Sequence, residues 1–153
     1  MVAVGQPAPN FTLYGEGSKE VTLDEFKGQN LVLFFFPKAF TKGCTLEARA
    51  FSEANAEFRK AGAQVIGMSA DDLPTLKKFS VEGCRSAFPV AIATKPVIKR
   101  YDVAMPVVGR LRAMTDRTSY VIAPDGRVAF VHSELDWSGH VAKTLAAVKA
   151  LKR

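Results

Sequence analysis

The sequence predicts an α/β fold in which helices flank a central mixed β-sheet. Three observations support this prediction. Residues 31–36 form an uninterrupted apolar run with aromatic and β-branched side chains, which is typical of a buried strand. An amphipathic helical pattern and a second apolar strand follow, and such a β-α-β unit is right-handed with parallel strands. Further on, two short apolar segments flank Asp125-Gly126, a dipeptide that favours a tight hairpin turn.

The first half of the chain supplies the β-α-β unit. Thr22-Leu23-Asp24-Glu25 has the form of a capping box, which predicts a short helix that Gly28 ends. Residues 45–61 place Leu46, Ala50, Ala54 and Phe58 on one helical face, and Gly62 ends this helix. The other elements expected in this half are a strand at 11–14, a turn at 15–17 and a strand at 64–69.

The second half predicts two more helices and a hairpin, besides a brief extended piece. Asp71 or Asp72 caps a helix that runs to about Glu82, with Pro74 in its first turn. The elements expected after it are an extended piece at 88–91, a short helix at 96–101, hairpin strands at 118–123 and 127–133, and a final helix from about residue 138. This order is that of thioredoxin-like folds, although many α/β domains share such an alternation.

Length and composition favour one domain that covers residues 1–153. The net charge of +6 comes from Lys and Arg scattered along the chain, without the basic stripe or module of a nucleic-acid-binding protein. No apolar run reaches the roughly 18 residues of a membrane span. We therefore expect neither nucleic acid nor a membrane as a partner.

The N-terminal segment lacks the pattern of a signal peptide, which favours a cytoplasmic protein. Thiols are kept reduced in the cytoplasm, so the two cysteines are expected to be reactive or inert thiols and not a permanent disulfide. With two Cys and two His and no ligand spacing, we expect no structural zinc. His132 and His140 are expected at the surface or at strand ends.

Cys44 occupies a position that favours a reactive thiol. It follows the C-terminal end of the expected central strand, where ligand sites of open α/β sheets collect, and lies in the first turn of the next helix. An ordinary thiol titrates near ~8.5, so a predominant thiolate at neutral pH needs about 2.7 kcal/mol. A helix N-terminus supplies ~0.3–1 kcal/mol, and up to ~2 in good geometry. An Arg or Lys from elsewhere in the chain is therefore expected beside the sulfur.

These residues carry a resemblance to a known family. Pro37-x-x-x-Thr41-x-x-Cys44 resembles the active-site signature of peroxiredoxins, and Cys44-Thr45-x-Glu47 is similar to their Q-type, or bacterioferritin-comigratory, subgroup. Arg117, in Arg117-Thr118-Ser119-Tyr120-Val121-Ile122, matches the family's active-site arginine, and the resemblance extends from residues 5–11 to 124–126. It implies the peroxiredoxin variant of the thioredoxin-like fold. It also implies a thiol peroxidase that reduces hydrogen peroxide and organic hydroperoxides through a Cys44 sulfenic acid.

The resemblance implies a role for each residue of this set. Cys44 attacks the peroxide, Thr41 hydrogen-bonds the thiolate and the peroxide, and Arg117 stabilises the charge on both. Pro37 limits water, and the backbone N–H groups of Gly43 and Cys44 complete the substrate site. Each residue also has a simpler interpretation. Pro37 could end a strand and Thr41 could cap a helix. Arg117 could be a surface residue and Cys44 a buried small apolar side chain. Thr41 stands where thioredoxin-like oxidoreductases carry the first cysteine of Cys-x-x-Cys, which excludes that chemistry.

The second thiol, Cys84, is the candidate resolving cysteine. Some Q-type members place this cysteine five residues after the nucleophile, where this chain has Arg49. Others place it in the following helix region, and Cys84 lies near there with a small offset. The alternative is an unreactive loop thiol. Because a helix of ~10 residues, about 15 Å long, precedes Cys84, we expect separated sulfurs in the reduced protein and local unfolding on oxidation.

The resemblance further implies a monomer that thioredoxin or a similar thiol reductant recycles, with no metal, flavin or haem. Two other functions stay open at this point. One is a one-cysteine peroxidase that uses an external thiol, and the other is a redox-sensing or chaperone-like protein with little turnover.

Overall fold

Strand β3 (Asn30–Phe35) forms the centre of the main sheet, and all six of its residues are buried. It pairs in parallel with β4 (Ala63–Ser69) and antiparallel with β6 (Thr118–Ile122). The strand order is β5-β4-β3-β6-β7, in which β5 (Val90–Ile92) extends the parallel half and β7 (Val128–Ser133) extends the antiparallel half. The predicted mixed sheet and its β-α-β unit are therefore confirmed.

The structure, a computed structural model, describes residues 2–9, 12–14, 20–26, 28–82, 88–104 and 115–151. The helices in these ranges are α1 (Lys42–Lys60), α2 (Leu73–Glu82), α3 (Lys95–Tyr101) and α4 (His140–Leu151), with 3-10 turns η2 (Leu23–Phe26) and η3 (Trp137–Gly139). Strands β1 (Thr12–Tyr14) and β2 (Glu20–Thr22) form a separate antiparallel pair. Within the described ranges, no helix combines the length and the apolar character needed to cross a membrane.

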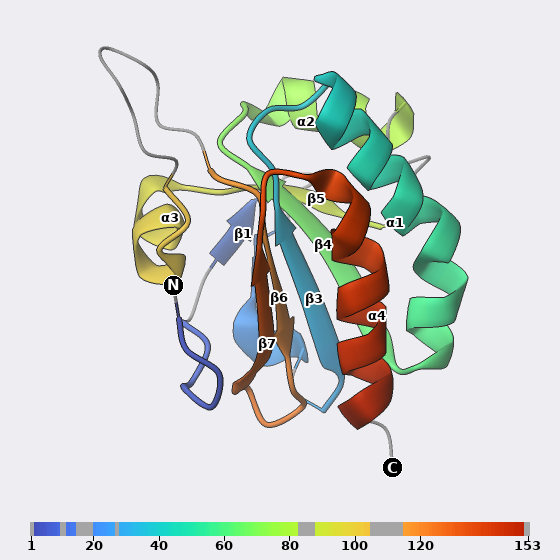
Figure 1. The fold of residues 1–153 in the computed structure, drawn as a ribbon. Coiled ribbons are helices and arrows are strands. Elements are labelled where there is room, and N and C mark those ends of the chain that lie inside the picture. Colours follow the sequence, from blue (N-terminus) through green and yellow to red (C-terminus); the bar gives the residue numbers. More distant parts are fainter. Residues whose placement is uncertain are drawn as a thin grey trace.

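Alternation along β3 divides the core between the two faces of the sheet. Leu31, Leu33 and Phe35 pack in the cluster that includes α3. Val32, Phe34 and Phe36 pack in the cluster that includes α1, α2 and α4. Figure 1 shows α1 and α4 side by side over this second face, with α3 on the opposite side of the sheet. Because helices cover both faces, the central strand is apolar from Leu31 to Phe35 and does not alternate with polar residues.

Most elements lie within a few residues of their predicted bounds, and the differences have local causes. α1 starts at Lys42 and not at residue 45, so Thr41 is its N-cap residue and Cys44 its third helical residue. Sequence patterns did not predict β2, whose three residues pair with β1. The final helix begins at His140, after the η3 turn. Phe11 and the predicted turn at 15–17 lie outside the described residues.

Two predicted helix boundaries have the expected physical basis. The Thr75 N–H donates to the Asp72 side chain at 2.9 Å, which caps the start of α2. Gly62 follows α1 with a φ of 80°, a left-handed conformation that glycine adopts without steric cost.

Candidate active site

The antiparallel pairing of β3 and β6 brings Arg117 to Cys44, although 73 positions separate them in the chain. Phe35 at the end of β3 pairs with Thr118 at the start of β6. The chain runs from β3 into α1, which carries Cys44, while Arg117 immediately precedes β6. The guanidinium Nη2 donates a hydrogen bond to the Cys44 Sγ at 3.4 Å, and both side chains are buried.

Two features fix the segment between β3 and α1. The Asp71 carboxylate, just beyond β4, accepts a hydrogen bond from the Ala39 N–H at 2.7 Å. Phe40 has a φ of 65°, a left-handed conformation that costs a non-glycine residue about 1–3 kcal/mol. Its ring packs edge-on against Phe79 of α2, with the centroids 5.2 Å apart. These contacts determine where α1 begins, and so where its unpaired first-turn N–H groups point.

Three acceptors hold the guanidinium of Arg117. Nε donates to the Leu135 carbonyl at 2.8 Å, Nη1 donates to the Glu47 carboxylate at 2.7 Å, and Nη2 donates to Cys44. Burial by itself lowers the pKa of Arg117, but Glu47 and Cys44 outweigh burial and the net shift is upward. The arrangement places a fixed positive charge next to the sulfur and can stabilise a negative charge there.

Glu47 is a member of the site to which the sequence analysis assigned no role. It lies on the buried face of α1 with Cys44, Ala48 and Phe51, and it is completely buried. A carboxylate on the apolar face of a helix needs a charged or hydrogen-bonding partner, and this position is the signal that identifies it. Burial raises the pKa of Glu47 to about 7, although Arg117 acts in the opposite direction.

His140 was expected at the surface or at a strand end, and that expectation is wrong because its ring is completely buried at the start of α4. The Ser119 Oγ of β6 lies 2.7 Å from Nδ1, and the Glu134 carbonyl oxygen lies 2.8 Å from Nε2. Both ring nitrogens thus have partners, which makes the burial of this histidine tolerable. Burial lowers the pKa of His140 to about 4. Half-buried His132 lies in β7 near its end, as expected.

The structure places the remaining predicted residues as follows. Gly43 packs against the guanidinium, since a Cβ added there would lie 3.2 Å from Arg117 Nη2. Pro37 is half-buried and follows β3 closely. Thr41 is the N-cap residue of α1, but its hydroxyl donates to the Lys38 carbonyl at 2.7 Å and does not cap the helix. Cys84 lies outside the described residues.

Comparison with known proteins identifies the family. The AhpC/TSA family profile matches residues 4–131. The chloroplastic peroxiredoxin Q of Oryza sativa subsp. japonica is 33% identical over 151 residues, which cover 98% of this chain and 68% of that protein. The crystal structure of peroxidoxin BcpB from Mycobacterium tuberculosis matches with a TM-score of 0.89 and 30% identity over 100% of both chains.

A structure of the Xanthomonas campestris bacterioferritin comigratory protein, a protein described for its alkyl peroxide reduction activity, matches with a TM-score of 0.88 and 28% identity. The match covers 99% of this chain and 100% of that one. These similarities extend over the sheet, its helices and the segment that carries Cys44. The chain belongs to the AhpC/TSA family, in its peroxiredoxin Q group, and is a thiol-dependent peroxidase with the thioredoxin-like fold.

Proposed function

We propose that Cys44 is the residue that reduces the hydroperoxide, with Arg117 and the start of α1 stabilising the charges involved. The observation that supports this proposal is the 3.4 Å contact between Arg117 Nη2 and the buried Sγ. The Cys44 thiolate attacks the terminal peroxide oxygen, an S–O bond forms and the O–O bond breaks. The leaving oxygen takes a proton and departs as water or an alcohol, and Cys44 is oxidised to a sulfenic acid.

The residues around Cys44 have separate roles in the proposed reaction. Arg117 stabilises the negative charge as it moves from the sulfur to the leaving oxygen. Because the Thr41 hydroxyl proton is directed to Lys38, the lone pairs of Oγ1 are left to accept a hydrogen bond from the peroxide O–H. Pro37 has no N–H to attract water. The N–H groups of Gly43 and Cys44 are unpaired at the start of α1 and supply hydrogen-bond donors to the substrate site.

The burial of Cys44 bears on which peroxides reach it. The residue is only 1% exposed. Hydrogen peroxide therefore needs a small displacement of the surrounding side chains, and a bulky hydroperoxide needs a movement of the segment between β3 and α1. Thr41 and Phe40 of this segment are exposed, which makes it the accessible side of the site.

Gly43 offers a test of the role of Arg117 that replaces none of the catalytic side chains. In Gly43→Ala, the added Cβ at 3.2 Å from Nη2 must push a guanidinium that three acceptors hold. A displacement of a few tenths of an ångström is expected to lower the rate constant for peroxide reduction about ten-fold. The folding stability should stay unchanged or rise, since alanine favours a helix more than glycine does. Stopped-flow kinetics and urea unfolding measure the two quantities.

Gly139→Ala is the matched control, because its added Cβ meets nothing closer than 3.7 Å. It should react with peroxide at the wild-type rate. A Gly43→Ala protein as fast as this control would contradict a role for the position of the guanidinium.

We further propose that Cys84 condenses with the Cys44 sulfenic acid, which releases water and forms an intramolecular disulfide, and that thioredoxin or a similar thiol reductant restores both thiols. Support comes from Cys84 being the one thiol besides Cys44 in the sequence and from its place two residues after α2. A disulfide needs the two Cα atoms within about 7 Å, so α2 or the start of α1 must rearrange locally if the two are separated in the reduced protein.

Turnover assays and mass spectrometry test this proposal together. With thioredoxin, its reductase and NADPH, the wild type should consume many equivalents of peroxide, while Cys44→Ser defines the background. One equivalent of peroxide should yield a linked Cys44–Cys84 peptide, and Cys84→Ser should instead accumulate a trappable sulfenic acid. Full thioredoxin-dependent turnover of Cys84→Ser would indicate a one-cysteine peroxidase. Wild-type consumption that stops after one equivalent would indicate a redox sensor.

The proposal extends to the state of the protein in the cell. We propose a monomer, built as a single domain over residues 1–153, that works in the cytoplasm. A length ordinary for one domain supports the single domain, and the resemblance to Q-type peroxiredoxins supports the monomer. Two cysteines used as redox-active thiols suit a reducing compartment such as the cytoplasm.

A further inference from the structure

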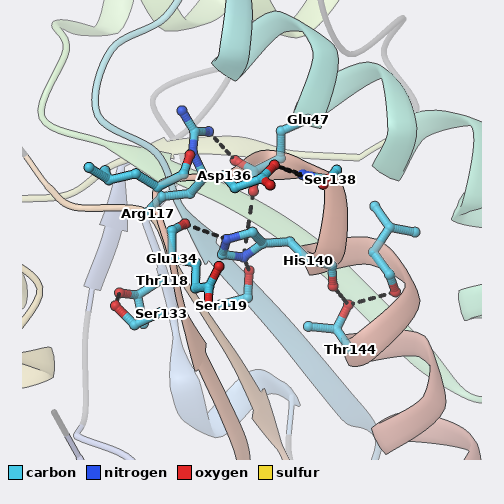
Figure 2. Close-up of polar contacts among 12 residues, drawn as sticks. Glu47, Arg117, Thr118, Ser119, Ser133, Glu134, Asp136, Ser138, His140 and Thr144 are labelled. Atoms are coloured by element: carbon cyan, nitrogen blue, oxygen red, sulfur yellow. Dashed lines mark hydrogen bonds and ion pairs between the residues drawn. The ribbon is translucent and has the colours of Figure 1, made fainter.

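A second buried contact extends from Glu47 to His140, and Figure 2 shows the two side chains between α1 and α4. Glu47 Oε2 and His140 Nδ1 are 3.6 Å apart, and both side chains are completely buried. The same carboxylate accepts the Arg117 hydrogen bond through its other oxygen, Oε1. The pair is thus closed to solvent and adjoins the guanidinium that contacts Cys44.

The surroundings of His140 determine which ring nitrogen carries hydrogen. The Glu134 carbonyl oxygen, 2.8 Å from Nε2, can only accept, so Nε2 carries the hydrogen. In the neutral ring, Nδ1 is then an acceptor, and the Ser119 hydroxyl at 2.7 Å donates to it. Neutral His140 therefore has no hydrogen to donate to Glu47 Oε2, because its Nδ1 lone pair already accepts from the Ser119 hydroxyl.

Glu47 Oε2 has no hydrogen-bond partner among the described residues. A buried ionised oxygen without a donor is costly, and a neighbouring lone pair makes it more so. One proton on Oε2 or on Nδ1 removes this conflict between two acceptors. At 3.6 Å, Oε2 and Nδ1 are too far apart to share a hydrogen bond, so a single proton resides on one side chain or the other.

The electrostatics of the pair support that proton. Burial raises the pKa of Glu47 to about 7 and lowers the pKa of His140 to about 4, so the proton resides on Glu47 below about pH 7. The titratable groups that act on the His140 ring are Arg117, His132 and Glu134, and it in turn acts on Asp136. Burial and Lys143 lower the pKa of His132, which is therefore neutral at neutral pH.

We propose that Glu47 and His140 hold one exchangeable proton between them, and that this proton sets how much of the Arg117 charge acts on Cys44. The inference rests on the role proposed above for Cys44 and Arg117. With the proton, the three side chains carry one net positive charge; without it, ionised Glu47 cancels the charge of Arg117. An ionised Glu47 and an ionised Cys44 thus compete for one guanidinium, and each opposes the ionisation of the other. His140 is a positioning residue that acts through Glu47.

Infrared spectroscopy of the reduced protein tests the proton directly and needs no peroxide. Over a pH titration, the wild type should show a protonated carboxyl band that disappears near pH 7, and Glu47→Gln should lack it. Because coupling is reciprocal, Cys44→Ser should bind this proton about five-fold more weakly, which moves the midpoint to lower pH. Absence of the band from the wild type, or an identical midpoint with serine at position 44, would overturn the proposal.

Alkylation of Cys44 by iodoacetamide provides a second readout. It is measured in a Cys84→Ser background, so that Cys44 is the thiol that reacts. The pH profile of the parent should contain an inflection near pH 7, and adding Glu47→Gln should remove that inflection. If the parent and the Glu47→Gln variant gave pH profiles of the same shape, ionisation of Glu47 would not be coupled to the reactivity of Cys44. Neither readout depends on peroxide reduction, so failure here with intact turnover would leave the proposed function standing, and an inactive protein with intact coupling would show the reverse.

Discussion

Replacing Arg117 with methionine is expected to lower the second-order rate constant for peroxide reduction about 10²–10³-fold, the usual cost of removing a donor that stabilises developing charge. Above pH 7, where Glu47 of the wild type is ionised, the same change leaves that carboxylate buried without its partner, which should destabilise the fold by about 3–5 kcal/mol. Stopped-flow kinetics under conditions where the variant is folded, together with urea unfolding, measure the two losses. Arg117→Lys keeps the charge, but a single ammonium cannot reproduce the three-way contact, so an intermediate rate is expected.

Two controls separate catalysis from folding. Exposed Arg127 donates to the Gly5 carbonyl, and Arg127→Met should leave the rate constant unchanged. Adding Glu47→Gln to Arg117→Met removes the unpaired charge, so the double variant should regain part of the lost stability without regaining activity. A rate that recovers along with stability would assign Arg117 a purely structural role.

The second large effect concerns the pH dependence of stability. In the unfolded chain at pH 4.5–6.5, His140 is protonated and Glu47 is ionised; in the folded protein, Glu47 keeps a proton up to about pH 7 and His140 is neutral above about pH 4. Both states then bind one proton, so the pair gives wild-type stability almost no slope in this range. Folding in effect moves a proton from the histidine to the carboxylate.

Breaking the pair should expose two opposite changes in the free energy of unfolding with pH, of about 3 kcal/mol each in total. In Glu47→Gln only His140 remains; its folded pKa is depressed, so stability is present above pH 6.5 and is lost as pH falls towards 4. In His140→Asn only Glu47 remains; its folded pKa is raised, so stability is present below pH 4.5 and is lost as pH rises through 7.

Urea unfolding of the three proteins between pH 4 and pH 8 measures these slopes. Subtracting the wild-type free energy of unfolding from that of each variant removes the contribution of all other titrating groups. The two difference curves should run in opposite directions. Level curves would mean that neither side chain changes its proton affinity on folding.

Sequence patterns predicted the strands and turns whose formation depends mainly on their own residues. Leu31–Phe36 are buried because an apolar run of that length has no solvated alternative, and the hairpin forms where Asp125-Gly126 permits the turn. The start of α1 was placed three residues late. The bonds that fix it come from distant residues such as Asp71, and local pattern does not reveal them.

The candidate site, like the fold, was predicted only in part from the sequence. The position of Cys44 at a helix start indicated that a cation must lie beside the sulfur, but only the resemblance selected Arg117 among the 21 lysines and arginines of the sequence. The roles of Glu47 and His140 arise from packing between α1, β6 and α4, which no local pattern encodes. Glu47 did leave a signal, because it shares a helical face with Phe51 and Phe58, and a carboxylate on an apolar face requires compensation. The predicted face was instead set on Leu46 and Ala50, which the structure leaves half-buried.

The long separation in sequence between the thiol and its arginine has a consequence for biosynthesis. A ribosome that has made α1 but not β6 has released a cysteine whose guanidinium partner is still untranslated. If Cys44 and Arg117 have the proposed roles, the emerging polypeptide carries a thiol of ordinary, slow reactivity, which limits its oxidation before folding. Its reaction with peroxide would then begin only when the strand that follows Arg117 joins the sheet.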